Sequence, residues 1–231
     1  ACFPEAKNST IYEAFIPVEC EQAPNEYLFQ INCLDNVDNT ITLEGKTQVV
    51  PFPFKKQKLL RVSEEKVEKE KLAFASQKLL DEKLKNIVAL SPKHKLWHGP
   101  FIIPFDATSI TSEFGTVRTN PTRGIYTHKG IDFSGQIKGT VWAPHDGIII
   151  EKDRYAFSGN TVVIDHGCGV FSLLFHLDSF NPDLEIGQKI KKGNPVGKMG
   201  MTGFADGYHL HWEMRINNVS IDPMEWTKNI W

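Results

Sequence analysis

Two histidines placed two positions apart are the feature of this sequence best suited to chemistry. His209 and His211 lie in an apolar run typical of a β-strand, in which residues i and i+2 project from one face about 6.5–7 Å apart. Leu210 and Trp212 then point to the opposite face, into packing. The two imidazoles would therefore lie side by side on a rigid element, which suits one metal ligand and one proton-transfer group. A solvated His-x-His on a surface strand has the same spacing, so the interpretation depends on partners elsewhere in the chain.

Such partners occur in two earlier motifs. His128 and Asp132 are four residues apart, and the intervening Gly130 argues against a helix. A straight strand would hold the two side chains about 13 Å apart, too far for one ion, so a bend at Gly130 is required. His176 follows at the end of another apolar strand. A catalytic zinc keeps three protein ligands and an open position for water. His128, Asp132 and one histidine of the pair would supply three ligands, which leaves two histidines for proton transfer or oxyanion binding.

The order of these motifs, His-x-x-x-Asp, then Phe-His-Leu, then His-Leu-His, resembles that of the lysostaphin/LytM-type zinc endopeptidases, which cut peptidoglycan cross-links. Residues 111–118 are similar to the family's S-x-F-G-x-R opening. Further segments follow in the family's order, at residues 139–147, 159–167 and 187–193. The resemblance runs from about residue 99 to about residue 225.

The resemblance implies a role for each motif residue. His128, Asp132 and His211 would be the ligands of Zn²⁺, and His209 and His176 the catalytic pair. The implied partner and substrate is the peptidoglycan stem peptide, entered along a groove. The DD-endopeptidase or carboxypeptidase type is favoured, and a glycyl-glycine endopeptidase stays open.

Two alternatives compete with this enzyme. Some relatives have lost ligands and act by binding peptidoglycan or activating wall amidases, but all five functional positions are present here. A structural zinc module would be closed by four ligands rich in cysteine, which these motifs lack. Where the family often has Ser-Thr-Gly-Pro before His-Leu-His, this chain has Ala205-Asp206-Gly207-Tyr208. We expect that departure to affect cleavage preference rather than the metal.

The other charged and histidine residues near the motifs have plainer interpretations. Glu213 shares the strand parity of the histidine pair and is interpreted as a supporting or groove-wall residue. His145 is expected to be solvated in a hairpin turn, and His166 to pack or hydrogen-bond in the sheet. His94 and His98 are interpreted as linker residues, because the following Gly-Pro breaks any helix.

Composition limits the partners and the location. A net charge of −2 over 231 residues gives no polyanion-binding footprint, so nucleic acid is not expected as a partner. The sequence contains no run of 18 apolar residues, so no transmembrane segment is predicted.

The sequence begins at Ala1-Cys2 without a signal peptide, so three explanations of this start stay open: mature protein, truncated chain and tag residue. The family resemblance implies export to the periplasm or cell envelope. A lipid anchor is one option, since Ala-Cys resembles the end of a lipoprotein processing site. A chance Ala-Cys dipeptide would look the same and is the alternative.

The four cysteines do not have the spacing of a zinc site. Cys2, Cys20 and Cys33 lie near the start, and in an exported protein one disulfide among them is an option, with free thiols an equally good alternative. Cys168 lies between two glycines and is interpreted as a turn residue.

Three parts are expected along the chain, and together they predict a mainly β protein. Residues 1–62 read as a small β-rich, sandwich-like accessory domain, with residues 54–59 resembling the last strand of immunoglobulin-like domains. Short strands with turns between them, one at Glu44-Gly45, are expected at residues 27–31, 40–43, 48–50 and 59–62. Residues 99–231, rich in glycine and short Val/Ile segments, predict a catalytic domain built on an antiparallel sheet with a groove.

Residues 63–98 change period and predict one amphipathic helix followed by a linker. Ser63 is a candidate N-cap, Glu64 and Glu65 suit the first turn, and Pro92 ends the pattern. Docking on a domain or bridging two fits better than a coiled coil, because fewer than four clean heptads are present. Since an unrestrained wall hydrolase endangers its own cell, the N-terminal domain could cover the groove, as is thought for some relatives.

Overall fold

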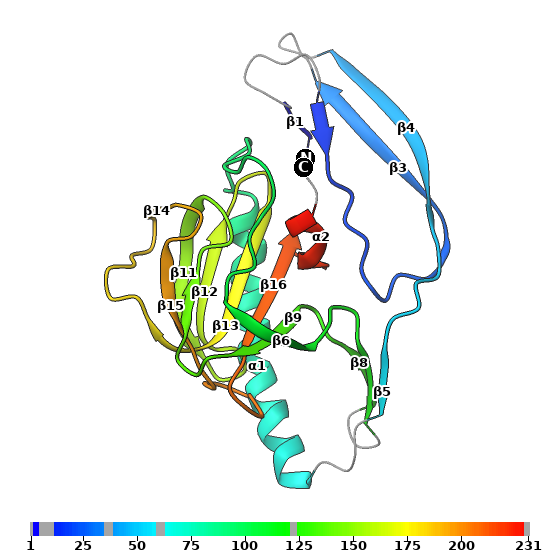
Figure 1. Cartoon of the computed structure of the whole chain (residues 1–231). Helices are drawn as coiled ribbons and strands as arrows, with labels where there is room; N and C mark the ends of the chain where they lie inside the picture. Colours follow the sequence, from blue (N-terminus) through cyan, green and yellow to red (C-terminus); the bar gives the residue numbers. More distant parts are fainter. Residues whose placement is uncertain (1, 5–11, 35–38, 59–62, 121–123, 229–231) are drawn as a thin grey trace.

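The computed structural model describes residues 2–4, 12–34, 39–58, 63–120 and 124–228. It is mainly β, as predicted, with a large antiparallel sheet and a long helix lying against it (Figure 1). Within the described residues, no helix combines the length and the apolar character that crossing a membrane would need.

Ten strands in the described part of the chain form the central sheet, and all its pairings are antiparallel. Its main path runs β14-β11-β12-β13-β16-β9-β6, with β10, β15 and β17 attached beside it. The strands are β6 (Ala107–Ser112), β9 (Ile131–Gly135), β10 (Thr140–Trp142), β11 (Gly147–Tyr155), β12 (Gly159–Asp165), β13 (Val170–Phe180), β14 (Lys189–Ile190), β15 (Pro195–Met199), β16 (Leu210–Ile216) and β17 (Val219–Ile221).

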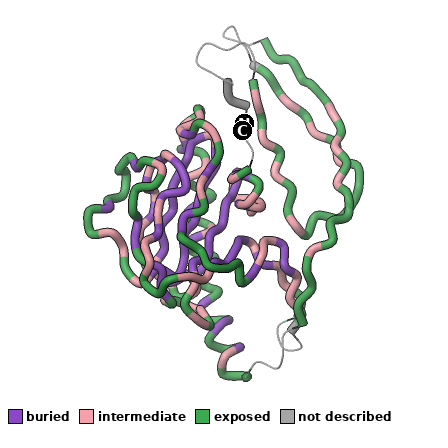
Figure 2. The backbone as a smooth tube through the Cα atoms, in the orientation of Figure 1, coloured by how far each residue is buried: buried purple, intermediate pink, exposed green. Residues whose placement is uncertain are grey.

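The two middle strands, β13 and β16, are buried on both faces, which Figure 2 shows as the purple centre of the molecule. One face carries the larger core, in which Trp212 and Met214 pack with the junction residues Trp97 and Phe101. Helix α2 (Pro223–Lys228) adds Trp226 to this core. The opposite face would expose apolar side chains to water without a cover, and helix α1 provides that cover.

Helix α1 (Glu64–Val88) matches the predicted element. The Ser63 hydroxyl caps it by accepting a hydrogen bond from the Lys66 N–H, and Glu64 and Glu65 occupy its first turn. Leu80 and Leu84 are fully buried against β12 and β13. The helix is therefore docked on the sheet, and it ends at Val88, before the predicted stop at Pro92.

The described residues of 1–62 do not build the expected sandwich. β1 (Cys2–Pro4) pairs with β2 (Tyr12–Ala14), and β3 (Asn25–Leu34) pairs with β4 (Thr40–Val49) in a separate two-stranded ribbon. Most described side chains of the β3–β4 ribbon are exposed, so it has no second sheet to pack against (Figure 2). A sandwich needs two inward-facing apolar layers, which this segment does not bury.

Two details of this region also differ from the prediction. Glu44-Gly45 is not a turn, because β4 continues through it opposite β3, and a Cβ at Gly45 would lie 2.3 Å from the Phe29 ring. β5 (Lys56–Lys58) does not close an immunoglobulin-like sheet but pairs in parallel with β7 (Val117–Asn120), which in turn pairs with β8 (Gly124–Thr127). The strand expected at residues 59–62 lies outside the described residues.

The cysteines show no disulfide among the described side chains. Cys20, Cys33 and Cys168 are free thiols, and the side chain of Cys2 lies outside the described residues. Cys168 adopts a left-handed conformation (φ 54°) between two glycines, as expected of a turn residue.

Candidate metal centre

Neighbouring strands bring the first histidine motif and the histidine pair together. β9 and β16 are paired so that Asp132 lies opposite His211. His128 precedes β9, and the chain bends at Gly130 between them, as the spacing required. A Cβ at Gly130 would lie 2.6 Å from both His211 Nε2 and the Trp212 carbonyl oxygen, so only glycine fits beside the pair. Leu210 and Trp212 point to the opposite face, into the core.

Three polar atoms converge at this point. His128 Nε2 lies 3.1 Å from Asp132 Oδ1 and 3.1 Å from His211 Nδ1, and His211 Nδ1 lies 2.8 Å from Asp132 Oδ1. The ligand atoms of the three residues all lie within 4.8 Å of one another. The His128 Nδ1–H can donate to the Glu113 carbonyl oxygen at 3.0 Å, which leaves the Nε2 lone pair facing the centre. Two imidazole nitrogens and one carboxylate oxygen are a donor set that suits zinc.

The electrostatics of the cluster depend on Asp132. Burial works to raise the pKa of Asp132, but hydrogen bonds from His128 and His211 outweigh it and hold this pKa well below its usual range. Burial lowers the pKa of His128. Burial acts in the same direction on His211, but Asp132 and Glu213 outweigh it and raise the pKa of His211 to about 9. The carboxylate therefore stays ionised, as a metal ligand must.

The other two motif histidines lie next to each other beside this cluster. The ring centroids of His176 and His209 are 4.7 Å apart, and His209 Nε2 lies 3.8 Å from Asp132 Oδ1. The Nδ1 of His176 lies 2.9 Å from the Thr202 carbonyl oxygen, and that of His209 2.8 Å from the Gly207 carbonyl oxygen. A carbonyl can only accept, so each Nδ1 carries the proton and each Nε2 keeps its lone pair.

His176 also has an unusual backbone. Its φ is 61°, a left-handed conformation uncommon for a non-glycine residue. Burial, together with the neighbouring imidazoles of His209 and His211, lowers the pKa of His176 to about 3. The ring is therefore neutral at neutral pH, with its Nε2 unprotonated. Strained backbone and neutral buried histidines are features often found at functional sites.

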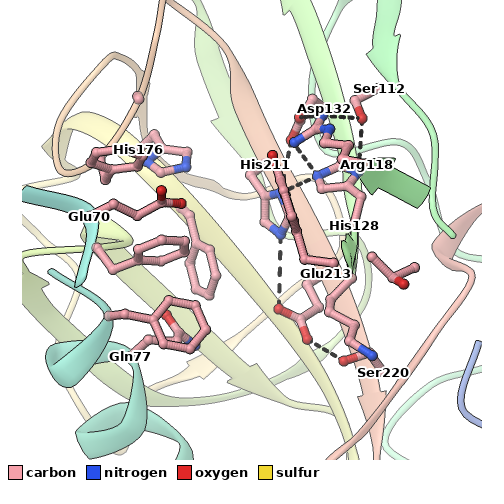
Figure 3. Close-up of a pocket in the computed structure, with 18 of the residues that line it drawn as sticks. Glu70, Gln77, Ser112, Arg118, His128, Asp132, His176, His211, Glu213 and Ser220 are labelled. Atoms are coloured by element: carbon pink, nitrogen blue, oxygen red, sulfur yellow. Dashed lines mark hydrogen bonds and ion pairs between the residues drawn. The ribbon is translucent and has the colours of Figure 1, made fainter. Parts of the chain in front are cut away.

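Glu213 lies on the side of His211 that faces away from Asp132, as expected from its position on the same strand face as the histidine pair. Its Oε2 lies 3.9 Å from His211 Nε2, while its Oε1 accepts hydrogen bonds from Arg215 and Ser220 at 2.7 and 2.6 Å (Figure 3). Burial works to raise the pKa of Glu213, but the Arg215 guanidinium outweighs it and lowers the pKa to about 2. An ionised carboxylate behind a ligating imidazole fixes the orientation of the ring.

Two site residues were not singled out from the sequence. Ser112 Oγ lies 3.1 Å from His128 Nδ1, and Arg118 donates to that Oγ at 2.6 Å. Both belong to the segment that resembles the family's S-x-F-G-x-R opening, although two residues, Thr116 and Val117, separate Gly115 from Arg118 in this chain. The sequence by itself assigns neither residue a role. Figure 3 shows both beside Asp132 and His128.

The remaining histidines lie away from the centre. His145 is buried, contrary to expectation, because its ring packs on Phe101 and its Nε2–H donates to the His98 carbonyl oxygen at 3.0 Å. His166 is fully buried and hydrogen-bonded in the sheet, as expected. His94 and His98 are exposed linker residues.

The cluster opens into a cleft of about 1830 Å³. Helix α1 forms one wall, and Figure 3 shows Glu70 of this helix near His176 and Gln77 farther along the helix. The loop before the histidine pair also lines the cleft and is tied to α1, since Asp206 forms an ion pair with Lys66. An elongated substrate therefore has room to lie across the histidines.

Comparisons with known proteins show similarity to peptidases. Residues 126–223 match Peptidase family M23. The chain is 31% identical over 121 residues to peptidoglycan DD-endopeptidase ShyC of Vibrio cholerae, which corresponds to 52% of this chain and only 28% of ShyC. A zinc containing peptidase from Vibrio cholerae shares the fold with a TM-score of 0.51 and 32% identity, over 55% of this chain and 40% of that one. A putative peptidase M23 from Pseudomonas aeruginosa, at 23% identity, shares the fold over 92% of this chain and 77% of that one, with a TM-score of 0.62.

Proposed function

We propose that this chain, whose residues 126–223 match Peptidase family M23, is a zinc-dependent peptidase of peptidoglycan. One observation supports this most directly. Two imidazole nitrogens and an ionised carboxylate converge beside two further histidines, and all open into one cleft. In this proposal His128, Asp132 and His211 hold the zinc, and His209 and His176 transfer protons.

The residues divide the work of amide hydrolysis between them. When bound, zinc polarises a peptide carbonyl and lowers the pKa of its water toward about 7. His209 and His176 present their Nε2 lone pairs beside the ligands, because the Gly207 and Thr202 carbonyl oxygens hold their Nδ1 protons. One imidazole takes the proton of the attacking water, and the other supplies a proton to the departing amine or stabilises the oxyanion.

The substrate proposal is a stem peptide or cross-link with a DD-peptide bond. Its support is the similarity to ShyC, whose name gives that specificity, and a cleft of about 1830 Å³ that contains the histidines. The chain spans 28% of the length of ShyC. For such a substrate we propose a location in the cell envelope, either in the periplasm or held there by a lipid anchor.

Metal analysis and digestion of purified muropeptides test this function together. The zinc-loaded chain should release products whose masses correspond to cleavage of DD cross-links. Removal of zinc with a chelator should abolish the release, and added zinc should restore it. A chain that binds one zinc and leaves every muropeptide intact would contradict the proposed activity. It would favour a role in wall binding or amidase activation instead.

We also propose that residues 1–62 act as an accessory part that restrains the catalytic part, residues 99–231, with residues 63–98 between them. Glu19 and Glu21 line the cleft, and Glu21 forms an ion pair with Lys129, next to His128. Glu21→Lys should repel Lys129 and raise the rate on muropeptides. Glu26→Lys, which reverses a charge in the β3–β4 ribbon, is the control. Equal rates for Glu21→Lys and the wild type would remove this contact as a restraint.

A further inference from the structure

Cationic side chains line the cleft, and several are neutralised by carboxylates. Lys66 is paired with Asp206, and Lys129 with Glu21. Arg118 differs from them. Among the described residues its nearest carboxylate oxygen is Asp132 Oδ2, which lies 3.9 Å from Nη2, beyond hydrogen-bond distance.

The guanidinium of Arg118 has donors to spare. Nη2 donates to Ser112 Oγ at 2.6 Å, and the buried Nε has no hydrogen-bond partner among the described residues. A guanidinium carries five N–H donors, and its exposed N–H groups can bind an acceptor that arrives with a ligand. The Arg118 side chain is 23% exposed and lines the cleft, so a ligand can reach it.

The position of Arg118 limits which part of a ligand it meets. Arg118 lies on β7, and its Nη2 is within 4 Å of Asp132, one of the three converging residues. Figure 3 shows Arg118 and Ser112 on the side of the cluster away from His176 and Glu70. A group bound by Arg118 therefore lies within a few bonds of the atoms that react at the cluster.

The substrate class proposed above carries a suitable group. In a DD-peptide bond between stem peptides, the scissile nitrogen is attached to a carbon that can bear a free carboxylate. That carboxylate carbon is two bonds from the scissile nitrogen. Guanidinium and carboxylate form paired, charge-assisted hydrogen bonds, the strongest class available to uncoordinated side chains. Glycine bridges offer no carboxylate beside an internal scissile nitrogen.

We infer that Arg118 is a specificity-determining residue that binds the carboxylate on the amine side of the scissile bond. This rests on the proposed function and deepens it, because it explains at one residue why a DD-peptide would be selected over a neutral bridge. The competing explanation is that Arg118 only positions Ser112, and through it His128. The two explanations predict different responses to a change in the substrate.

The test uses the zinc-loaded full chain and two cross-linked muropeptide dimers. One dimer has a free carboxylate beside the scissile nitrogen, and in the other this carboxylate is amidated. The wild type should cleave the first with a kcat/KM about 10–100-fold higher, the range of a charge-assisted hydrogen bond. Arg118→Gln should remove this preference, lowering the rate on the first dimer and leaving the second within about threefold of wild type. Arg118→Lys should keep part of the preference, since it keeps the charge without the planar fork.

Controls separate the inference from the proposed function. Lys78→Gln removes a cleft-lining charge on helix α1 and should leave the preference unchanged. Zinc content of each variant shows whether the ligand cluster is intact. If the wild type cleaves both dimers equally, or if Arg118→Gln lowers both rates by the same factor, the inference is wrong while the proposed function stands. Failure of the zinc-loaded wild type to cleave either dimer would overturn both.

Discussion

Backbone carbonyl groups decide which nitrogen each histidine offers to the site. The carbonyl oxygens of Glu113, Thr202 and Gly207 each accept from an Nδ1–H, so three rings present Nε2 to the cleft. His211 is the exception, because its Nδ1 faces Asp132 and its Nε2 faces Glu213. Two histidines from one strand face thus use different nitrogens, which makes separate roles for them physically reasonable.

The first prediction separates metal binding from proton transfer. His211→Ala leaves two of the three converging ligands and should lose most of the bound zinc. His209→Ala and His176→Ala should keep about one zinc per chain and still lose about 10²–10⁴-fold in activity, the usual scale for general acid–base groups. Metal content and peptidase rate are measured on the same samples. Loss of zinc in His209→Ala with retention in His211→Ala would reverse the assignment, and retention in both would place the metal elsewhere.

At the scale of elements, helix α1 and strand β16 are joined by a buried ionic chain. Arg215 donates to Glu213 Oε1 and to Asp81 Oδ1, both at 2.7 Å, and Asp81 lies on the helix. Apolar packing of Leu80 and Leu84 on the sheet reinforces the attachment. Because Glu213 also faces His211, the fit of the helix and the orientation of a proposed ligand depend on the same residues.

The second prediction tests this ionic chain. Arg215→Met should destabilise the protein by about 3–5 kcal/mol, because it leaves the buried Glu213 carboxylate without its partner. Replacing both residues, as Glu213→Gln with Arg215→Met, removes the uncompensated charge and should recover part of that loss. Denaturant unfolding of both variants and the wild type, with a chelator present, measures the difference. Equal stability of the wild type and Arg215→Met would show that the chain contributes little.

At the scale of the whole molecule, the fold encloses a neutral histidine far from the cleft. His166 is fully buried, with Nε2 2.9 Å from Ser172 Oγ and Nδ1 2.7 Å from the Asp146 carbonyl oxygen. Burial lowers the pKa of His166 to about 3. The unfolded chain takes up this proton near pH 6.5, while the folded chain resists it until about pH 3. Stability from this residue is therefore complete above pH 6.5 and falls as the pH decreases toward 3.

The third prediction follows from this sign. Between pH 7 and pH 5, His166 alone should lower the free energy of unfolding by about 2 kcal/mol. His166→Gln cannot take up the proton, so its stability should depend less steeply on pH across this range. Denaturant unfolding of both proteins with a chelator present excludes loss of metal as the cause. Parallel pH profiles for the two proteins would show that His166 does not titrate on unfolding.

The sequence by itself determined the features that depend on neighbours in the chain. Strand parity placed His209 and His211 on one face, and the four-residue spacing of His128 and Asp132 required the bend that the structure has at Gly130. Helix α1 began at its predicted cap for the same reason, since capping and periodicity act within a few residues.

Only the tertiary structure decided the features that depend on contacts between distant segments. β5 pairs in parallel with β7, about 60 residues later in the chain. His145 is buried and hydrogen-bonded to the carbonyl oxygen of His98, 47 residues away, although its local sequence is that of an exposed turn. The spare donors of Arg118 became visible only when Ser112 and Asp132 were placed around it. Contacts of this kind produce no recognisable periodicity or motif spacing in the sequence, because the residues that make them are far apart in the chain. Only the folded structure determines them.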